Sequence, residues 1–279
     1  MTSKPLAFRV DEARCTRCGL CATDCPSRII ALEGPGFPAI RPDQEALCIQ
    51  CQHCLAVCPE GAISILGHDP ADSLPIQGLP TFGQMDLLAR SRRSVRQYKD
   101  ENVDPALLQR LLESLAHAPT GVNCRKLRFT VIQDKAVLAA FRERVLAALV
   151  RLQASGRMPE HAGYLSAMLG AWQDQQRDAI FRGAPHLLLV SAPPDTPTPQ
   201  QDVSLTLAYF ELLAQSAGLG TVWVGLLKRA LELAPDLKPL LDLPADHIYY
   251  AMLFGVPAVR YHRTVQRAGT AQVHTVAAI

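Results

Sequence analysis

The feature that most constrains this chain is a cysteine pattern that occurs twice near its beginning. The segments CTRCGLCATDCP, from residue 15, and CIQCQHCLAVCP, from residue 48, share the spacing C-x2-C-x2-C-x3-C-P and lie 33 residues apart. Eight of the nine cysteines belong to these two runs. Cysteines at such spacings are metal ligands, whereas the cysteines of a disulfide framework would be scattered along a larger secreted chain. The pattern therefore predicts thiolates that hold metal.

The same run is found in bacterial two-cluster ferredoxins, in which the first three cysteines hold one 4Fe-4S cluster and the fourth reaches the other. Pro26 and Pro59 follow the fourth cysteines and redirect the chain. The pattern thus predicts two crossed ligand sets: Cys15, Cys18, Cys21 and Cys58 for one cluster, and Cys48, Cys51, Cys54 and Cys25 for the other.

Short strands are expected on both sides of each run, in FRVD, RIIAL, PAIRP and AISIL, which would give a ferredoxin fold with pseudo-twofold symmetry. Zinc is one alternative occupant, but a doubled four-cysteine run with a proline after each fourth member is not a zinc-ribbon spacing. Clusters that only stabilise the fold are a second alternative. Two adjacent clusters favour an electron relay, because one cluster is enough to stabilise a fold.

Composition limits the remaining classes of protein. The 28 Lys and Arg residues nearly balance the 26 Asp and Glu residues, and 48% of the chain is hydrophobic, which is typical of a soluble globular protein with a sizeable core. At 279 residues we expect two domains. We find no apolar signal segment and no apolar run near the roughly 20 residues that span a bilayer, so we expect a cytoplasmic protein without a membrane partner. The charge balance gives no indication of a nucleic-acid partner.

The domain organisation follows from a change in sequence texture. The stretch GHDPADSLPIQGLPTFGQ, at 67–84, is rich in proline and glycine and has no hydrophobic periodicity, which indicates a linker. We therefore expect a two-cluster ferredoxin domain at 1–68, a linker at 69–85 and a second domain at 86–279.

Helices and strands alternate in the second domain. The segment DPALLQRLLESLAHA predicts a helix with Asp104 as N-cap and Pro105 at its first position, and QDVSLTLAYFELLAQSAGLG predicts a helix closed by glycine. Strands are expected in LRFTVIQD, HLLLVSA, TVWVGLL and HIYYAMLFG. An α+β or α/β domain of about 190 residues is thus expected.

Five segments of this domain occur in a familiar order. The basic segment RSRRSVRQY would by itself suit an exposed helix face, but it is followed by APTGVNC, RGAPHLLLV, GLGTVWVG and FGVPAVRYHR. In this order, residues 86–267 resemble the nitroreductase superfamily of flavin enzymes, particularly members with an N-terminal two-cluster ferredoxin domain. The resemblance implies an α+β fold with a central, mostly antiparallel sheet flanked by helices. It also implies a homodimer with FMN at the subunit interface.

The resemblance further implies which residues contact FMN. Arg92, Arg93 and Ser94 would surround the phosphate and ribityl chain, with Arg96 nearer the pyrimidine edge. A phosphate dianion suits bidentate guanidinium partners, and a fixed cation stabilises the negative charge of reduced flavin. The remaining implied contacts are Pro119, Thr120, Gly121 and Asn123 from the second subunit, Val222, Trp223, Val224 and Gly225 near flavin N5, and Arg263 and Arg267 near the phosphate.

The chain also departs from the family pattern. Many members continue the asparagine segment with Gln-Pro-Trp, whereas here Asn123 is followed by CRKL. Arg125 and Lys126 either favour an acidic substrate or simply face solvent. We expect Cys124 to be a packed thiol and Trp223 to belong to the core. In the variable stretch 154–183, Tyr164, Met168, Trp172 and Phe181 either line a pocket or, for most of them, pack in the core.

Our leading functional hypothesis is an FMN-dependent oxidoreductase that receives electrons through its own ferredoxin domain. The donor would be a low-potential protein such as ferredoxin or flavodoxin, and the acceptor a nitro compound, quinone or activated alkene. We find no G-x-G-x-x-G dinucleotide fingerprint, but flavin reductases of this superfamily let NAD(P)H stack directly on FMN. The alternatives are a non-catalytic electron carrier or redox-responsive module, and a flavin-fragmenting or dehalogenating relative.

Overall fold

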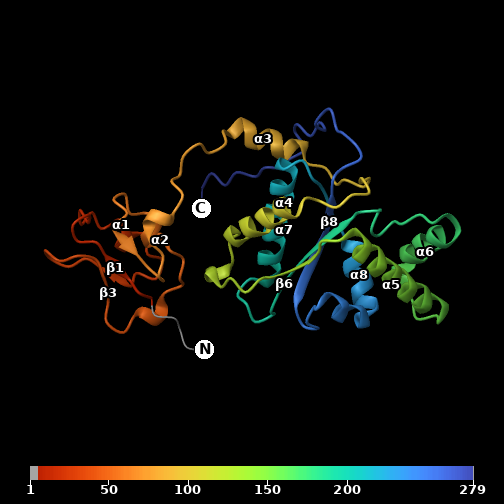
Figure 1. The fold of residues 1–279 in the computed structure, drawn as a ribbon, viewed down its shortest axis with the longest axis horizontal. Coiled ribbons are helices and arrows are strands. Elements are labelled where there is room, and N and C mark those ends of the chain that lie inside the picture. Colours follow the sequence, from red (N-terminus) through yellow and green to blue (C-terminus); the bar gives the residue numbers. More distant parts are fainter. Residues whose placement is uncertain (1–5, 279) are drawn as a thin grey trace. The chain divides into compact units, whose positions relative to one another are not determined.

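The chain divides into two compact units in the computed structural model, which describes residues 6–278. One unit comprises the chain up to Leu79 together with Val122–Cys124, and the other comprises Pro80–Gly121 and Arg125 onward (Figure 1). The proline-rich stretch between them contains a short 3-10 turn, η2 (Pro70–Asp72), and then the helix α3 (Phe82–Ser91). Thr81 and Gln84 form a capping box. The helix therefore begins inside the stretch 69–85 that was expected to be linker.

The cysteine-rich unit is built from two short antiparallel ribbons and two one-turn helices. Its ribbons pair β1 (Arg9–Val10) with β4 (Ile63–Ser64), and β2 (Ile30–Ala31) with β3 (Ala39–Ile40). These pairs confirm the four short strands expected around the cysteine runs. The helices are α1 (Leu20–Thr23), α2 (His53–Ala56) and the 3-10 turn η1 (Glu45–Leu47). A small apolar core that includes Ile29, Leu55 and Ile63 lies between them.

The second unit is organised around one four-stranded antiparallel sheet. Its strand order is β5-β6-β8-β7, so the two longest strands lie in the middle. Every residue of the central strand β6 is buried. The strands are β5 (Arg128–Ile132), β6 (His186–Ala192), β7 (Gly220–Trp223) and β8 (Ile248–Gly255).

Helices cover both faces of this sheet (Figure 1). The helix α4 (Pro105–Ser114) and the 18-residue α7 (Pro199–Ser216) pack on one face. The opposite face is covered by α5 (Lys135–Ala154), α6 (Gly163–Gln175) and α8 (Gly225–Leu233). Short 3-10 turns complete the unit: η3 (Leu115–His117), η5 (Glu160–Ala162) and η6 (Pro235–Leu241). A further turn, η4 (Gly121–Asn123), begins in this unit and continues into the segment Val122–Cys124, which is grouped with the cysteine-rich unit.

The two layers follow from the period-2 alternation of strand side chains. On β6, Leu187 and Leu189 belong to the core beneath α5 and α8, whereas Leu188 and Val190 belong to the core beneath α4 and α7. The central strands are apolar at successive positions because both faces are covered. This arrangement is the α+β fold with a central antiparallel sheet that we expected.

Two sequence expectations for this unit have different outcomes. The N-cap of α4 is confirmed, since the Asp104 carboxylate accepts hydrogen bonds from the backbone N–H groups of Ala106 and Leu107. The strand expected over TVWVGLL is too long, because β7 ends at Trp223 and α8 begins at Gly225. A Cβ atom at residue 225 would lie 2.7 Å from the Tyr250 hydroxyl, so the turn into α8 needs glycine. Among residues 6–278, no helix combines the length and the apolar character needed to cross a bilayer.

Candidate redox sites

Four of the predicted cluster ligands surround one small cavity in the cysteine-rich unit. Its lining contains the whole first ligand set, together with backbone and apolar groups that include Gly19, Pro38 and Ile63. Cys21 is buried, and burial is the main reason why the pKa of its thiol is raised. The neighbouring thiols of Cys58 and Cys15 add to that increase. Cys58 therefore lies with the first cysteine run, although it belongs to the second.

The second ligand set shows the same crossing. Burial raises the pKa of Cys48, and the nearby thiols of Cys51 and Cys25 raise it further. Burial also raises the pKa of Cys54 to about 12, with Cys51 and Cys48 among its neighbours. Cys25 of the first run thus accompanies the cysteines of the second. These buried thiols are in an environment where a bound metal, rather than solvent, would have to stabilise the thiolate form.

Backbone N–H groups already point at two of the sulfur atoms. The N–H of Gln50 donates to Cys48 Sγ at 3.4 Å, and the N–H of Ala62 donates to Cys58 Sγ at 3.2 Å. Hydrogen bonds to cluster sulfurs are one way in which proteins set the reduction potential. In the part of the chain that is described, no three histidine, cysteine or carboxylate side chains close around a single-ion site. Two sets of four thiols with N–H donors to sulfur fit 4Fe-4S clusters.

A second site lies in the sheet-based unit, where a cavity of about 380 Å³ opens beside β7. It brings together five of the residues singled out from the sequence. These are Arg96, Val222, Trp223, Val224 and Gly225. Four further lining residues were not among the predicted contacts: Tyr164, Ile180, Arg182 and Leu226.

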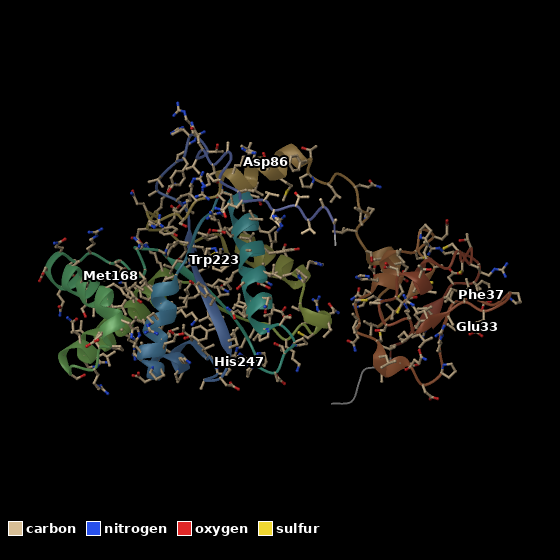
Figure 2. The ribbon with its side chains drawn as sticks, turned by 180° about the vertical axis from the view of Figure 1, so that it is seen from behind. Glu33, Phe37, Asp86, Met168, Trp223 and His247 are labelled. Atoms are coloured by element: carbon tan, nitrogen blue, oxygen red, sulfur yellow. The ribbon has the colours of Figure 1, made fainter. Side chains whose placement is uncertain are left out.

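The buried carboxylate of Glu211, on α7, holds three groups behind this cavity. Its oxygens accept hydrogen bonds from Arg92 Nη1 at 3.2 Å, Trp223 Nε1 at 3.2 Å and the Thr221 hydroxyl at 3.4 Å. Trp223, which is labelled in Figure 2, also packs against Tyr250, with ring centroids 5.5 Å apart. Trp223 was expected to be a core residue, but it is only half-buried and lines the cavity while its indole N–H is held from behind.

The basic segment RSRRSVRQY is held against β7 by hydrogen bonds of its backbone. Ser94 forms a parallel bridge with Thr221, and the N–H of Val95 donates to the Thr221 carbonyl at 2.9 Å. A Cβ atom on Gly220 would lie 2.6 Å from Val95, so only glycine allows this close approach. Arg93 donates to the backbone carbonyls of Arg92 and Arg90, and Arg96 donates to the Ser94 carbonyl at 3.2 Å.

The segment 118–125 is anchored by a hydrogen bond to α7 and does not line the cavity beside β7. The N–H of Gly121 donates to the buried Asp202 carboxylate at 3.0 Å, and Thr120 Oγ1 accepts from the N–H of Arg125 at 3.1 Å. Val122, Asn123 and Arg125 all have positive φ angles of 45–55°, which is costly for residues with side chains. Pro119, Thr120, Gly121 and Asn123 do not line the Arg96 cavity. The family resemblance assigns these four residues to the FMN of a second subunit.

The C-terminal arginines are also separate from Arg96. Arg263 lines another cavity, of about 450 Å³, together with Ser91, Gly220, Arg260 and His262. Arg267 is exposed, and its carbonyl accepts a hydrogen bond from the Thr270 hydroxyl. Gly220 follows the end of α7 and begins β7, so the two cavities lie at opposite ends of this short strand.

Comparison with known proteins identifies this arrangement. Residues 89–256, which include the basic segment, the sheet and the cavity beside β7, match the model of the nitroreductase family. The chain belongs to the nitroreductase family. Residues 14–63 match the 4Fe-4S dicluster domain, which covers both cysteine runs. The protein is therefore an oxidoreductase of this family that also carries a ferredoxin-type domain.

Individual relatives agree with this assignment. The chain is 28% identical over 145 residues to an iodotyrosine deiodinase from Thermotoga neapolitana, which covers 48% of this chain and 70% of the relative. A nitroreductase with bound FMN from Bacteroides fragilis superposes with a TM-score of 0.54 at 22% identity, over 67% of this chain and 97% of its own. An FMN-dependent nitroreductase from Clostridium difficile gives 0.52 at 20% identity, over 70% and 100%. The solved structures confirm the fold of the second unit.

Proposed function

We propose that the protein is an iron-sulfur flavoprotein oxidoreductase that takes electrons from a low-potential donor through two 4Fe-4S clusters to FMN. A small organic acceptor, such as a nitro compound, quinone or activated alkene, then receives them. The observation that carries this proposal is the convergence of Arg96 and residues 222–225, at the junction of β7 and α8, on one cavity of a nitroreductase fold. The same chain holds two crossed sets of cysteines.

The residues around the cavity fit FMN. Val222, Val224 and Leu226 offer an apolar wall for a flat ring, and Arg96 supplies a cation at its edge. Gly225 is one of the lining residues, and a side chain at this position would collide with Tyr250. When bound, FMN accepts electrons one or two at a time and passes a hydride equivalent to an organic molecule. This chain's own residues would bind the ring, fix the cation and exclude water from the apolar wall.

The phosphate end of FMN would be met by other cations. Arg92, Arg93 and Ser94 lie directly before Arg96, and Arg263 lies in the cavity that reaches Gly220 and Ser91. In the described structure the Arg92 guanidinium is already held by Glu211. We infer that Glu211 orients Arg92 for the phosphate, while the guanidinium of Arg96, which lines the cavity, serves the ring. Arg267 remains a proposed phosphate contact on the basis of the family pattern alone.

A homodimer belongs to the same proposal. Pro119, Thr120, Gly121 and Asn123 do not line the cavity of their own chain, and the family pattern assigns them to the second subunit. The strained backbone at Asn123, with φ of 55°, is the kind of geometry found where a segment is positioned for function. We propose that this segment reaches the flavin of the partner chain.

Fusion of the two units supports an internal electron path. A ferredoxin joined to its acceptor by a short linker is present at a high effective concentration, which removes a diffusional step. Membership of the nitroreductase family makes the protein an oxidoreductase, and the electron donor and acceptor are part of our proposal. The alternative of a non-catalytic carrier differs in one measurable respect, since it would not turn over small acceptors in the absence of a partner protein.

The experiment is anaerobic stopped-flow reduction of the full chain by reduced ferredoxin, followed through flavin absorbance. We expect fast flavin reduction in the wild type and slow reduction in Cys54→Ser, which removes a buried ligand of one cluster. Cys124→Ser is the matched control, because Cys124 is the cysteine outside both runs. Reduction by dithionite should be preserved in both variants. Equal rates for wild type and Cys54→Ser with reduced ferredoxin would refute the relay, and failure to turn over 4-nitrobenzyl alcohol would favour the carrier.

A further inference from the structure

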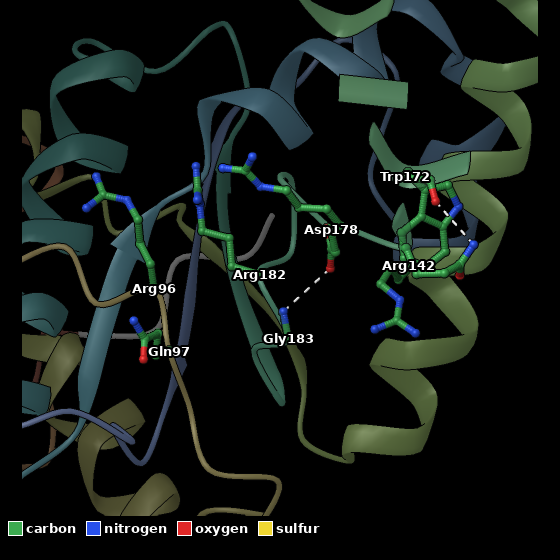
Figure 3. Close-up of a pocket in the computed structure, with 9 residues that line it drawn as sticks. Arg96, Gln97, Arg142, Trp172, Asp178, Arg182 and Gly183 are labelled. Atoms are coloured by element: carbon green, nitrogen blue, oxygen red, sulfur yellow. Dashed lines mark hydrogen bonds between the residues drawn. The ribbon is translucent and has the colours of Figure 1, made fainter. Parts of the chain in front are cut away.

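A second, larger cavity lies beside the proposed flavin site and is lined mainly by cations (Figure 3). Its volume is about 650 Å³. Four arginines line it, and Asp178 is the one carboxylate among its lining residues. The arginines come from three separate parts of the second unit: Arg96 from the basic segment, Arg142 from α5, and Arg177 and Arg182 from the turn between α6 and β6.

The single carboxylate does not neutralise these cations. Asp178 accepts hydrogen bonds from the backbone N–H groups of Ile180 at 3.0 Å and Phe181 at 2.7 Å, so it caps the turn that leads into β6. Within residues 6–278, Arg96, Arg177 and Arg182 form no ion pair with a carboxylate. The lining therefore carries an excess of positive charge.

The position of Arg182 shows that this charge is held in place. Burial lowers the pKa of Arg182, and the neighbouring charge of Arg96 lowers it further. Its backbone has a φ of 56°, which is an unfavourable conformation for a residue with a side chain, and Gly183 follows with a φ of 67°. The Asp178 cap and the left-handed pair at 182–183 fix the backbone of this turn, and Arg182 lines the cavity beside the like charge of Arg96.

The far wall of the cavity combines a cation with an aromatic face. Arg142 lies over the ring of Trp172, 5.6 Å from its centroid, and Figure 3 shows the two side chains together on the side opposite Arg96. Stacking on tryptophan orients the guanidinium. Arg142 Nε and Nη2 also donate to Glu143 Oε1 at 3.2 and 3.0 Å, and this carboxylate does not line the cavity.

Two residues connect this cavity to the proposed flavin site. Arg96 and Arg182 line both the arginine cavity and the smaller cavity beside β7. A molecule whose reacting end lies at the flavin would therefore have these two guanidinium groups beside it, and Arg142 and Arg177 beyond them. We assign the phosphate of FMN to Arg92 and Arg263. It therefore does not neutralise the positive charge of the arginines that line the larger cavity.

We propose that the arginine cavity, lined by Arg96, Arg142, Arg177 and Arg182, binds the carboxylate of the electron acceptor, so that the enzyme prefers organic acids. This inference rests on the proposed function, since it names the class of acceptor at the same site. Guanidinium groups pair with carboxylates through two parallel N–H···O bonds, which gives orientation as well as affinity. Neutral acceptors of the same size would lack this anchor and react less efficiently.

The test compares two acceptors of similar size in the FMN-loaded full chain, 4-nitrobenzoate and neutral 4-nitrobenzyl alcohol. We expect the wild type to have the higher kcat/KM with 4-nitrobenzoate. Arg177→Gln and the double variant Arg142→Gln/Arg177→Gln should lower the ratio of the two kcat/KM values by about tenfold or more, the scale of one charge-assisted contact. Arg144→Gln is the matched control, because Arg144 is exposed on the same helix as Arg142 and does not line the cavity.

A binding measurement removes the dependence on turnover. Calorimetric titration of oxidised, FMN-loaded protein with 4-nitrobenzoate should show binding that weakens with added salt and falls about tenfold in Arg177→Gln. Arg177 is exposed, so its replacement should leave the fold intact. An unchanged ratio of kcat/KM and unchanged binding in both variants would overturn the inference. If the variants instead raise KM for NADPH alone, the anion belongs to the donor and the assignment to the acceptor is wrong. Failure of the wild type to turn over either 4-nitrobenzoate or 4-nitrobenzyl alcohol would count against the proposed function itself.

Discussion

At the scale of single residues, the arginines of the basic segment have different environments. Arg92 is paired with the buried Glu211, whereas Arg96 donates to the Ser94 carbonyl and lines the cavity beside β7. A guanidinium fixed by a carboxylate is oriented before a ligand arrives, which lowers the entropic cost of binding. Two neighbouring residues of one type can therefore serve different ends of the same cofactor.

We expect Arg92→Ala and Arg96→Ala to affect FMN differently. Loss of a charge-assisted phosphate contact in Arg92→Ala should weaken FMN binding by about ten- to hundredfold. Arg96→Ala should mainly lower the flavin reduction potential, because the reduced ring loses a nearby cation. Equilibrium dialysis of FMN and anaerobic potentiometry measure the two effects. The assignment of the segment fails if both variants bind and titrate FMN as the wild type does.

Glu211 provides a second prediction at this scale. Replacing it with alanine would leave the Trp223 and Thr221 donors and the Arg92 cation without their buried acceptor. We expect the free energy of unfolding to fall by about 1.5–3 kcal/mol, the range for hydrogen bonds to charged groups. Urea denaturation of the holoprotein measures this. Glu101→Ala, which removes an exposed carboxylate 3.8 Å from Lys99, should change stability by less than about 0.5 kcal/mol.

The buried His186 should make stability depend on pH. Burial lowers its pKa from the ordinary 6.5, and its Nε2 accepts a hydrogen bond from the N–H of Val103 at 2.9 Å, which requires the neutral ring. Between the lowered pKa and 6.5, the unfolded chain binds more protons than the folded chain, so stability rises with pH and is lost as the pH falls through this window. His186→Gln keeps an acceptor but removes the titration.

We therefore expect a smaller decrease in the free energy of unfolding below pH 6.5 in His186→Gln than in the wild type. Urea denaturation at a series of pH values measures the slope. The exposed His117 provides the control, since His117→Gln should retain the wild-type slope. A wild-type slope in His186→Gln as well would show that other groups cause the acid sensitivity.

At the scale of elements, α7 organises both the segment 118–125 and the region behind β7. Its first turn carries Asp202, which accepts hydrogen bonds from the N–H of Gly121 and the Thr198 hydroxyl at 3.0 and 2.8 Å. Nine residues later, Glu211 holds Trp223 on β7. A single helix with two buried carboxylates thus fixes a loop and a strand that are distant in sequence.

The contact at Gly121 leads to a prediction with an internal control. A Cβ atom there would lie 2.2 Å from Thr198 Oγ1, which itself donates to Asp202. Gly121→Ala should therefore lower the free energy of unfolding by about 1–3 kcal/mol through overpacking. Gly170 lies inside α6 with open space around its Cβ position, so Gly170→Ala should raise stability by about 0.5–1 kcal/mol. Urea denaturation of the two variants should give changes of opposite sign.

At the scale of the whole molecule, the chain combines two chemically distinct units. The second unit has a large core cluster on each face of its sheet. The cysteine-rich unit has a smaller core cluster of seven buried residues, which include Cys21 and Cys54. Such a small core gives little stability of its own, so bound metal should contribute to folding of the first unit. The cysteine-rich unit should consequently be the part that depends on its inorganic cofactor.

Metal analysis tests this unit directly. Protein purified without oxygen should contain roughly eight iron and eight sulfide per chain, as two 4Fe-4S clusters require. Removal of iron with a chelator under reducing conditions should unfold the cysteine-rich unit, detected by hydrogen exchange at β1 and β4, and leave the sheet β5-β6-β8-β7 protected. Cys54→Ser should contain about half of the iron. Stoichiometric zinc without iron would contradict the cluster assignment.

The cysteine pattern and the regular elements were predictable because their signals are local. A cluster wraps one short loop, so its ligand spacing is visible in the sequence, and the side-chain alternation of β6 and the cap at Asp104 depend on neighbouring residues. The end of β7 was not predictable, since it depends on the distant Tyr250 packing against Gly225. The hydrogen bond from Trp223 to Glu211 was not predictable for the same reason, because the two residues lie on different elements.

The sequence by itself determined the α+β class, the dicluster domain and the segment that contributes Arg96, and it predicted the two crossed ligand sets. Only the tertiary structure decided that Glu211 holds Arg92 across 119 residues of chain, and that Arg142, Arg177 and Arg182 gather beside Arg96 in one cavity. The physical reason is that periodicity and capping act within a few residues of the chain. Charges on separate elements come together only when burial of the two faces of the sheet folds those elements against one another.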